Sequence, residues 1–259
     1  MYLKTWKQLA SMSFSTTLSN RIDSLSYLGG KILRFIFFFI FILSLFRFVD
    51  TVGGYTKYET LLFFLTFNLI DVGSQLLLRG IYMLRSEVKK GNFDMVLVKP
   101  TNPLFLIFSR LIDFLDLIFI IPIIGLLLYT ISQLDIQLTI LTIFLYLLFF
   151  TLSSILVLAI HIITAAVTVY TMESDNVLWL YREAMTIGRF PPSIYASGIQ
   201  QFFTYFIPII IIVAYPTQLL LGEITLKHAT LACIFTLCFF ICSLFVWQLS
   251  LQKYSSASS

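Results

Sequence analysis

The sequence predicts an all-α, polytopic membrane protein, and two features of its composition carry that prediction. Of its 259 residues, 59% are hydrophobic and only 12% are charged, whereas soluble domains average about 25% charged residues. The apolar residues also form long continuous runs without alternation, which indicates membrane-spanning helices and excludes a β-barrel. The net charge of +4 is modest, and the basic residues gather in particular loops. Such clustering indicates basic residues that set the orientation of a membrane protein rather than a surface that binds nucleic acid.

Residues 1–30 are expected to form an N-terminal helix that lies in the membrane interface. Apolar side chains such as Leu3 and Trp6 recur there at helical spacing, with basic residues between them, as in interfacial helices. The stretch lacks the apolar core and cleavage site of a signal peptide. Gly29-Gly30 should end this helix before a six-helix domain over residues 31–259.

Six spans are predicted in that domain. In chain order they cover about 32–49, 60–78, 104–129, 138–169, 199–221 and 229–251. The fourth is too long for one perpendicular crossing at about 1.5 Å per residue, so it should tilt or project beyond the bilayer. Polar stretches at 79–103 and 171–192 are expected to be loops on one face.

The distribution of Lys and Arg predicts the orientation. With the N-terminus in the cytoplasm, all but three of the 17 Lys and Arg residues fall on the cytoplasmic side. The exceptions are Arg47, Lys57 and Lys227. Because cytoplasmic loops carry the excess of positive charge, both termini are expected in the cytoplasm.

A polar stripe follows one face of the second predicted span. Asn68, Asp71, Gln75 and Arg79 are separated by three, four and four residues, so they should face protein or water rather than lipid. They could line a substrate path or form a proton site. The alternative, which we favour, is a hydrogen-bonded seam in which Asp71 connects through Gln75 toward Arg79.

Two further sets of polar residues occur near predicted spans. Arg110, Asp113 and Asp116 follow one another at steps of three, so a local Arg110–Asp113 pair is expected to act as a structural anchor. His161 shares its helix face with hydroxyl side chains, and a packing role with a hydroxyl or carbonyl partner is favoured over a catalytic one.

The sequence contains no motif for chemistry. It lacks a P-loop, a G-x-S-x-G serine and an H-E-x-x-H zinc motif, and it has no paired His or Cys ligands. We therefore predict no catalytic residue, no metal site and no cofactor bound by this chain. Uphill transport would need energy from another chain or from an ion gradient.

Three local patterns resemble one known family. GNFDMVLVKP at 91–100, followed by Asn102-Pro103, resembles the motif G-x-[IF]-D-x-x-L-[LV]-[RK]-P-x-x-P. PPSIY at 191–195 resembles a P-x-x-I-Y element, and Ile207-Pro208 with YPTQLLLG at 215–222 resembles an I-P…Y-P-x-x-x-L-L-G segment. In this order they are similar to bacterial ABC transporter permeases of type 2, in the subgroup of multidrug-type or uncharacterised export permeases.

The resemblance implies a half-transporter in the bacterial cytoplasmic membrane. Two permeases, identical or a sister pair, would assemble in the lipid bilayer with two copies of a separate ATP-binding subunit, which would hold ATP and Mg. The N-terminal helix and the loop after the second span would contact that ATPase. The candidate coupling residues are Arg85, Glu87, Lys89, Lys90 and Asp94.

Three functions follow as hypotheses. In the first, the chain is an exporter permease for an amphipathic or hydrophobic substrate such as a drug, lipid or peptide, with Asn68, Asp71, Gln75 and His161 as possible path residues. In the second, it is a membrane enzyme that modifies lipid through His161. In the third, it is a proton-coupled carrier that uses Asp71. The first is favoured because His161 lacks a chemical companion and the sequence lacks an internal repeat.

Overall fold

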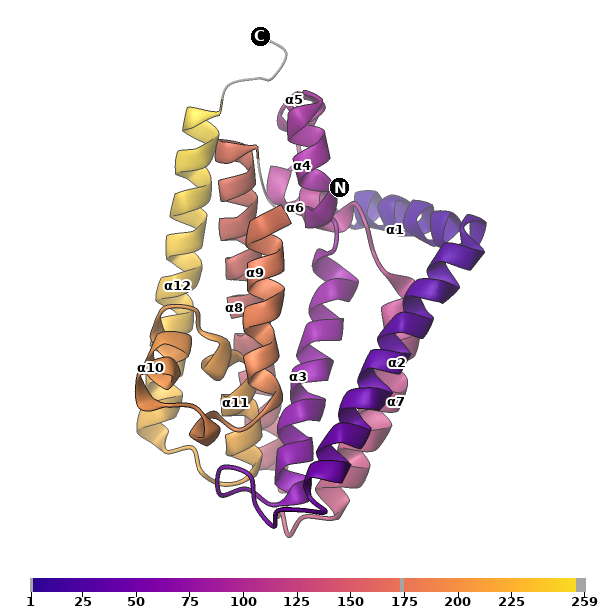
Figure 1. The fold of residues 1–259 in the computed structure, drawn as a ribbon. Coiled ribbons are helices and arrows are strands. Elements are labelled where there is room, and N and C mark those ends of the chain that lie inside the picture. The colour runs from indigo at the N-terminus through magenta and orange to yellow at the C-terminus, as the bar shows by residue number, and fades with distance from the viewer. Residues whose placement is uncertain (1, 173–174, 255–259) are drawn as a thin grey trace.

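The computed structural model describes residues 2–172 and 175–254, and these residues form helices without a β-strand (Figure 1). The longer helices are α1 (Tyr2–Ser19), α2 (Arg21–Leu45), α3 (Lys57–Leu78), α7 (Phe114–Ser132), α8 (Ile140–Thr171), α9 (Asp175–Met185), α11 (Ile209–Leu220) and α12 (Leu226–Lys253). The shorter ones are α4 (Ile81–Lys89), α5 (Asp94–Leu97), α6 (Pro103–Ser109), α10 (Ser197–Tyr205) and the 3-10 turns η1 (Thr186–Arg189) and η2 (Pro192–Ile194). The all-α fold class is confirmed.

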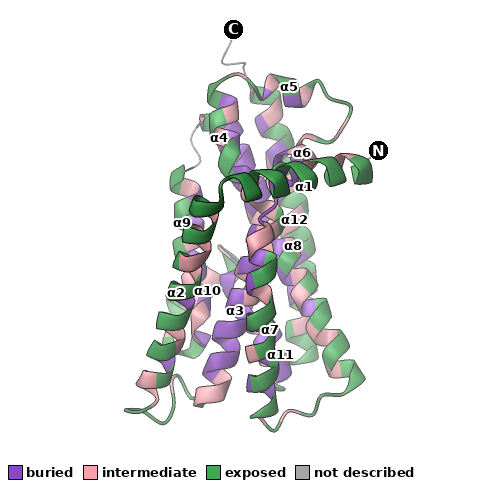
Figure 2. Cartoon of the chain, turned by 90° about the vertical axis from the view of Figure 1, so that its right-hand side faces the viewer, coloured by how far each residue is buried: buried purple, intermediate pink, exposed green. Residues whose placement is uncertain are grey.

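The bundle is organised around α3. Five stretches of the described chain are long and apolar enough to cross a membrane: α2, α3 together with α4, α7, α8 and α12. In the most apolar part of each, 56% of the residues are buried for α3–α4, against 11% for α2 and 17% for α12. Figure 2 shows the same contrast between a buried α3 and exposed outer faces on α2 and α7. Apolar side chains that face outward are what a lipid environment requires.

Helix α8 is longer than the others, as the sequence indicates. Its 32 residues span about 48 Å at the helical rise of 1.5 Å per residue. The last turns pass the end of α3 and pack against α4: Ile162 and Val169 share one buried cluster with Ile81 and Val88. These last turns of α8 support the polar segment after α3.

The third predicted span, 104–129, is not one helix. α6 ends at Ser109, and α7 begins at Phe114 after Asp113 caps it by accepting a 3.1 Å hydrogen bond from the Leu115 backbone. α6 crosses directly over the junction of α3 and α4, where a Cβ on Gly80 would lie 2.0 Å from the Ile107 carbonyl oxygen. In this part of the chain, α7 is therefore the helix that can cross the membrane.

The break between the N-terminal helix and the first span also differs from the prediction. α1 ends at Ser19, whereas Gly29 and Gly30 lie inside the continuous helix α2. The Ser13 hydroxyl holds α1 over the α6–α7 break, donating to the Arg110 carbonyl (3.3 Å) and accepting from the Ile112 N–H (3.2 Å). Figure 1 shows α1 lying across the end of the bundle, at a steep angle to α2.

Residues 175–194 run from one end of the bundle to the other, so the prediction of a cytoplasmic loop at 171–192 is wrong. At the start, Asp175 forms an ion pair with Arg85 of α4. At the far end, the Ser193 hydroxyl donates a 2.6 Å hydrogen bond to the Gly53 carbonyl in the α2–α3 loop, which lies opposite α4 (Figure 1). One face of α9 is buried in the bundle, and its charged residues line a cavity rather than a continuous apolar surface, so its low hydropathy concealed the crossing.

The fifth predicted span, 199–221, is a bent hairpin rather than a crossing. α10 and α11 meet at an angle of 99°, and the bend falls at Pro208, which has no backbone N–H to continue a helix. Both arms return to the α2–α3 loop, since Ser193 precedes α10 and Glu223, after α11, accepts a 2.6 Å hydrogen bond from Tyr55. With 175–194 as the additional crossing, α1 and the end of α12 lie at the same end of the bundle.

Candidate functional site

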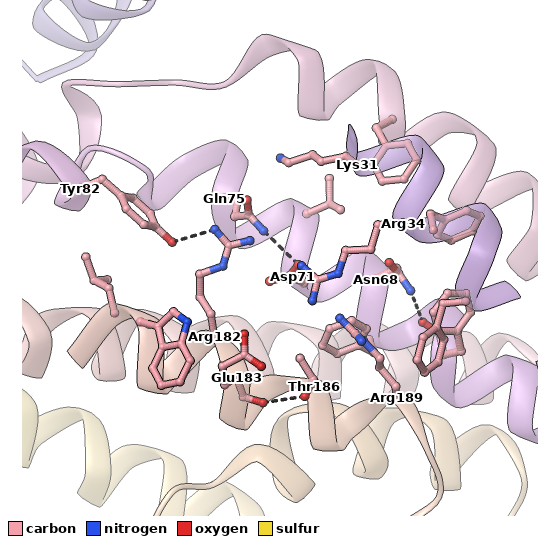
Figure 3. A pocket seen from close by; sticks show the side chains of 18 of the residues that line it. Lys31, Arg34, Asn68, Asp71, Gln75, Tyr82, Arg182, Glu183, Thr186 and Arg189 are labelled. Carbon is pink, nitrogen blue, oxygen red and sulfur yellow. Dashed lines mark hydrogen bonds between the residues drawn. The ribbon is translucent and has the colours of Figure 1, made fainter. Parts of the chain in front are cut away.

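A cavity of about 450 Å³ lies between α2, α3 and the α9–η1 segment (Figure 3). Tyr82 of α4 and Phe119 of α7 complete its wall. The charged and amide side chains that line it are Lys31, Arg34, Asn68, Asp71, Gln75, Asp175, Arg182, Glu183 and Arg189. Of the four path residues predicted from the sequence, Asn68, Asp71 and Gln75 are therefore brought together here.

One part of the cavity is aromatic. Phe35 and Phe38 of α2 stack on Phe64 of α3 with ring centroids 5.3 and 5.2 Å apart. Phe119 meets Phe35 edge-on at 5.5 Å. The accessible edges of these rings line the cavity next to charged groups, the combination that small-molecule sites in proteins commonly show.

The polar stripe on α3 forms most of the predicted seam. The Gln75 amide donates to the Asp71 carboxylate at 2.9 Å, and its oxygen accepts from the Tyr27 hydroxyl at 3.3 Å. Asn68 donates to the Phe64 carbonyl at 2.7 Å. The link to Arg79 is absent among the described contacts, because that side chain turns to another helix. The seam thus ends at Tyr27, and Asp71 keeps one carboxylate edge toward the cavity.

Arg79 belongs to a buried ion network that joins α2, α3 and α7. It pairs with Asp113, while Lys31 pairs with Asp116 and lies 3.9 Å from Asp113. The Asp116 side chain is fully buried. The expected local pair of Arg110 with Asp113 is wrong, because the chain is not helical between α6 and α7 and the two side chains diverge. Arg110 pairs instead with Glu87 of α4.

The predicted coupling residues lie on α4, α5 and the turn between them. Glu87 pairs with Arg110, Arg85 pairs with Asp175, and Asp94 accepts a 2.9 Å hydrogen bond from Tyr254. Two of the five are exposed, Lys89 and Lys90. The segment is therefore fixed on the bundle by several side chains, and two exposed lysines lie where α4 ends.

A comparison with protein families decides what kind of protein this is. The family model described as "ABC-2 family transporter protein" matches residues 32–258. The chain belongs to the ABC-2 transporter family. It is a permease subunit of an ABC transporter and a multi-pass membrane protein, and its family implies an ATP-binding partner. No curated protein and no solved structure matches the chain.

The motifs that carried the resemblance have structural roles in this permease. Phe93 of the first motif is fully buried beneath Trp247 and Tyr254 at the end of α12. Ser193 of the second motif anchors the end of the α9–η2 segment to Gly53. The motifs therefore mark the points where the two polar segments are attached to the bundle.

His161 lies outside the cavity lining of the permease. Its Nδ1 atom is 2.8 Å from the Val157 carbonyl oxygen, and its ring meets Tyr181 edge-on at 4.9 Å. The side chain is buried. These contacts agree with the packing role favoured from the sequence, with a carbonyl rather than a hydroxyl as the partner.

Sequence reasoning missed the arginines of the cavity. Arg182 and Arg189 were assigned to a loop, and Arg34 was counted only as a topological charge. Arg182 donates to the Tyr82 hydroxyl at 3.3 Å, and Arg189 lies over aromatic rings. One signal could have found them: residues 171–192 are numerous enough to cross a bilayer, and their charges are separated by apolar residues at helical spacing.

Proposed function

We propose that the permease is half of an ATP-driven exporter. Two permeases, identical or a sister pair, would form the translocation path with two copies of an ATP-binding subunit, which supplies ATP and Mg²⁺ binding. The cavity between α2, α3 and α9 would be this chain's share of the path. Its aromatic and charged lining suits an amphipathic or hydrophobic substrate such as a drug, lipid or peptide.

The observation that carries this proposal is the connection between the α4–α5 segment and the cavity wall. Arg85 on α4 pairs with Asp175 at the start of α9. Tyr82 on α4 accepts a hydrogen bond from Arg182, which lies two turns further along α9. A displacement of α4 by a partner would therefore be passed to α9, which lines the cavity. Movement of packed elements at such contacts is how sites are coupled.

The same arrangement supports the proposed orientation in a bacterial cytoplasmic membrane. The end of the bundle that carries α1, α4, α5 and the last turn of α12 also carries most of the Lys and Arg residues outside the cavity. Because cytoplasmic segments are enriched in basic residues, this end would face the cytoplasm. Both termini would then be cytoplasmic, within reach of the ATPase.

The test is purification of the tagged permease from its native membrane in mild detergent, followed by mass spectrometry. We expect a stoichiometric P-loop ATPase, which the double variant Lys89→Glu/Lys90→Glu should lose. The matched control is Arg47→Glu/Lys227→Glu, which makes the same charge change at exposed sites on the opposite end. A preparation without any ATPase, or equal retention by both double variants, contradicts the proposal.

A further inference from the structure

Two arginines extend into the same part of the cavity from different elements. Arg34 comes from α2 and Arg189 from η1 (Figure 3). Among residues 2–172 and 175–254, neither guanidinium has a carboxylate within ion-pair distance. Arg189 lies instead 4.7 Å from the ring centroid of Phe38 and 5.1 Å from that of Phe67. Arg189 is thus placed against aromatic rings, with Arg34 in the same part of the cavity and neither arginine in an ion pair among the described residues.

Two of the other charged groups that line the cavity are held in ion pairs. Lys31 pairs with Asp116, and Asp175 pairs with Arg85; neither partner lines the cavity. The lining then retains three arginines against two acids, Asp71 and Glu183. Asp71 accepts the Gln75 amide. The cavity lining therefore carries one more positive charge than negative charges.

Cations inside the helix bundle of a membrane protein are costly unless they serve a ligand or a partner. A guanidinium presents paired N–H donors that match the two oxygens of a carboxylate or phosphate. The aromatic rings beside the two arginines would cover the apolar part of the same molecule. A volume of about 450 Å³ falls in the range of pockets that hold a drug-sized ligand.

We infer that the cavity binds an amphiphile with one anionic group, a carboxylate or a phosphate. The anionic group lies between Arg34 and Arg189, and the apolar part lies against Phe35, Phe64 and Phe119. This inference rests on the proposed function, since it names the substrate class of the proposed path. The Asp71 carboxylate lines the same cavity and lowers the affinity for the anion by repulsion.

The experiment measures binding of matched fluorescent probes to the purified permease in phosphatidylcholine nanodiscs. The probes are a dansylated undecanoic acid, its neutral methyl ester and an undecyl trimethylammonium analogue. We expect the acid to bind on the order of tenfold more tightly than the ester. Unlabelled dodecyl phosphate should displace it, and inorganic phosphate should not, which separates an amphiphile from a free anion.

Variants assign this preference to the two arginines. Arg34→Gln/Arg189→Gln should bring the acid to the affinity of the ester and leave the ester unchanged. Asp71→Asn should tighten binding of the acid. Arg47→Gln, which removes an exposed charge outside the cavity, should change neither.

Three results overturn the inference: no saturable binding of any probe, equal or tighter binding of the ester or the ammonium probe, or an equal loss of acid and ester in the double variant. The binding assay needs no ATPase, so its outcome is separate from the proposed function. If the ATPase co-purifies but the cavity binds the acid no more tightly than the ester, only the inferred substrate class is wrong. If the cavity prefers the acid but no ATPase co-purifies, only the proposed exporter function is wrong.

Discussion

Two neighbouring groups of charged residues differ in whether their charges are paired. In the network of Lys31, Arg79, Asp113 and Asp116, each charge has a partner of opposite sign on another helix. One turn along α2, Arg34 opens into the cavity without such a partner among the described residues. Closed networks resist removal of one member, because a buried charge would remain. A charged side chain without such a partner can instead bind and release a ligand.

The largest effect is expected in the closed network. Lys31→Met would leave the fully buried Asp116 carboxylate without its cation, which costs about 3–5 kcal/mol. The measurement is thermal unfolding of the purified permease in detergent. Lys31→Met/Asp116→Leu should recover most of the loss, since an apolar pair replaces an ion pair well. A single variant as stable as the wild type would show that the network is not what joins α2 to α7.

The pair between Arg85 and Asp175 should matter for coupling more than for stability. Its side chains are 32% and 61% exposed, so reversing one charge should cost less than about 1 kcal/mol of stability. In the reconstituted complex, Arg85→Glu should lower substrate-stimulated ATP turnover several-fold. The exchange Arg85→Glu/Asp175→Arg should restore it. Unchanged turnover in Arg85→Glu would separate α9 from the movement of α4.

Asp71 distinguishes an ATP-driven permease from a proton-coupled carrier. Asp71→Asn retains an oxygen that accepts the Gln75 amide, so stability should change by less than about 1 kcal/mol. Transport by this variant should still require ATP, and a pH gradient alone should drive no transport by the wild type. Transport that runs on a pH gradient and stops in Asp71→Asn would favour the carrier.

A smaller effect is expected at His161, which is satisfied within its own helix. His161→Gln should leave transport within about twofold of the wild type, because glutamine can also donate to the Val157 carbonyl. The isolated permease, incubated with lipid, should release no modified product by mass spectrometry. A lipid product that disappears in His161→Gln would support the membrane-enzyme hypothesis.

The smallest effect is expected where Tyr55 joins the α2–α3 loop to Glu223. Burial raises the pKa of the Tyr55 phenol to about 12, and Glu223 adds to the shift. The neutral donor is thus retained at pH 7, and its contribution falls only as the pH rises above about 10 toward 12. Tyr55→Phe should cost less than about 1 kcal/mol. The difference in Tm from the wild type should be present at pH 7 and shrink above about pH 10.

Hydropathy predicted most of the apolar helices well, missed the break in the third span, and gave the wrong path for two segments. α3, α8 and α12 lie within a few residues of their predicted bounds, because long apolar runs can be buried only in lipid or in the bundle. Residues 175–194 cross the bundle although they are polar, and 199–221 bend back although they are apolar. In both cases packing against α3 and α8 overrode the local signal.

The candidate site was predicted in part for the same reason. The α3 stripe was readable, since its spacing placed Asn68, Asp71 and Gln75 on one helix face. The arginines opposite them come from other elements, and only the tertiary fold brings them to the cavity. The partners of Arg79 and Arg110 could not be read from spacing either, because the chain unwinds before Asp113.

The polar crossing at 175–194 has a consequence for how the permease enters the membrane. A segment with Arg182, Glu183 and Arg189 is poorly suited to partition into lipid by itself. It can be accommodated once α3 and α8 supply the surface that covers its apolar face. We therefore expect this segment to insert late, and until it does, α12 lacks the preceding crossing that sets its direction. Insertion of the C-terminal half and assembly of the cavity wall would then occur together.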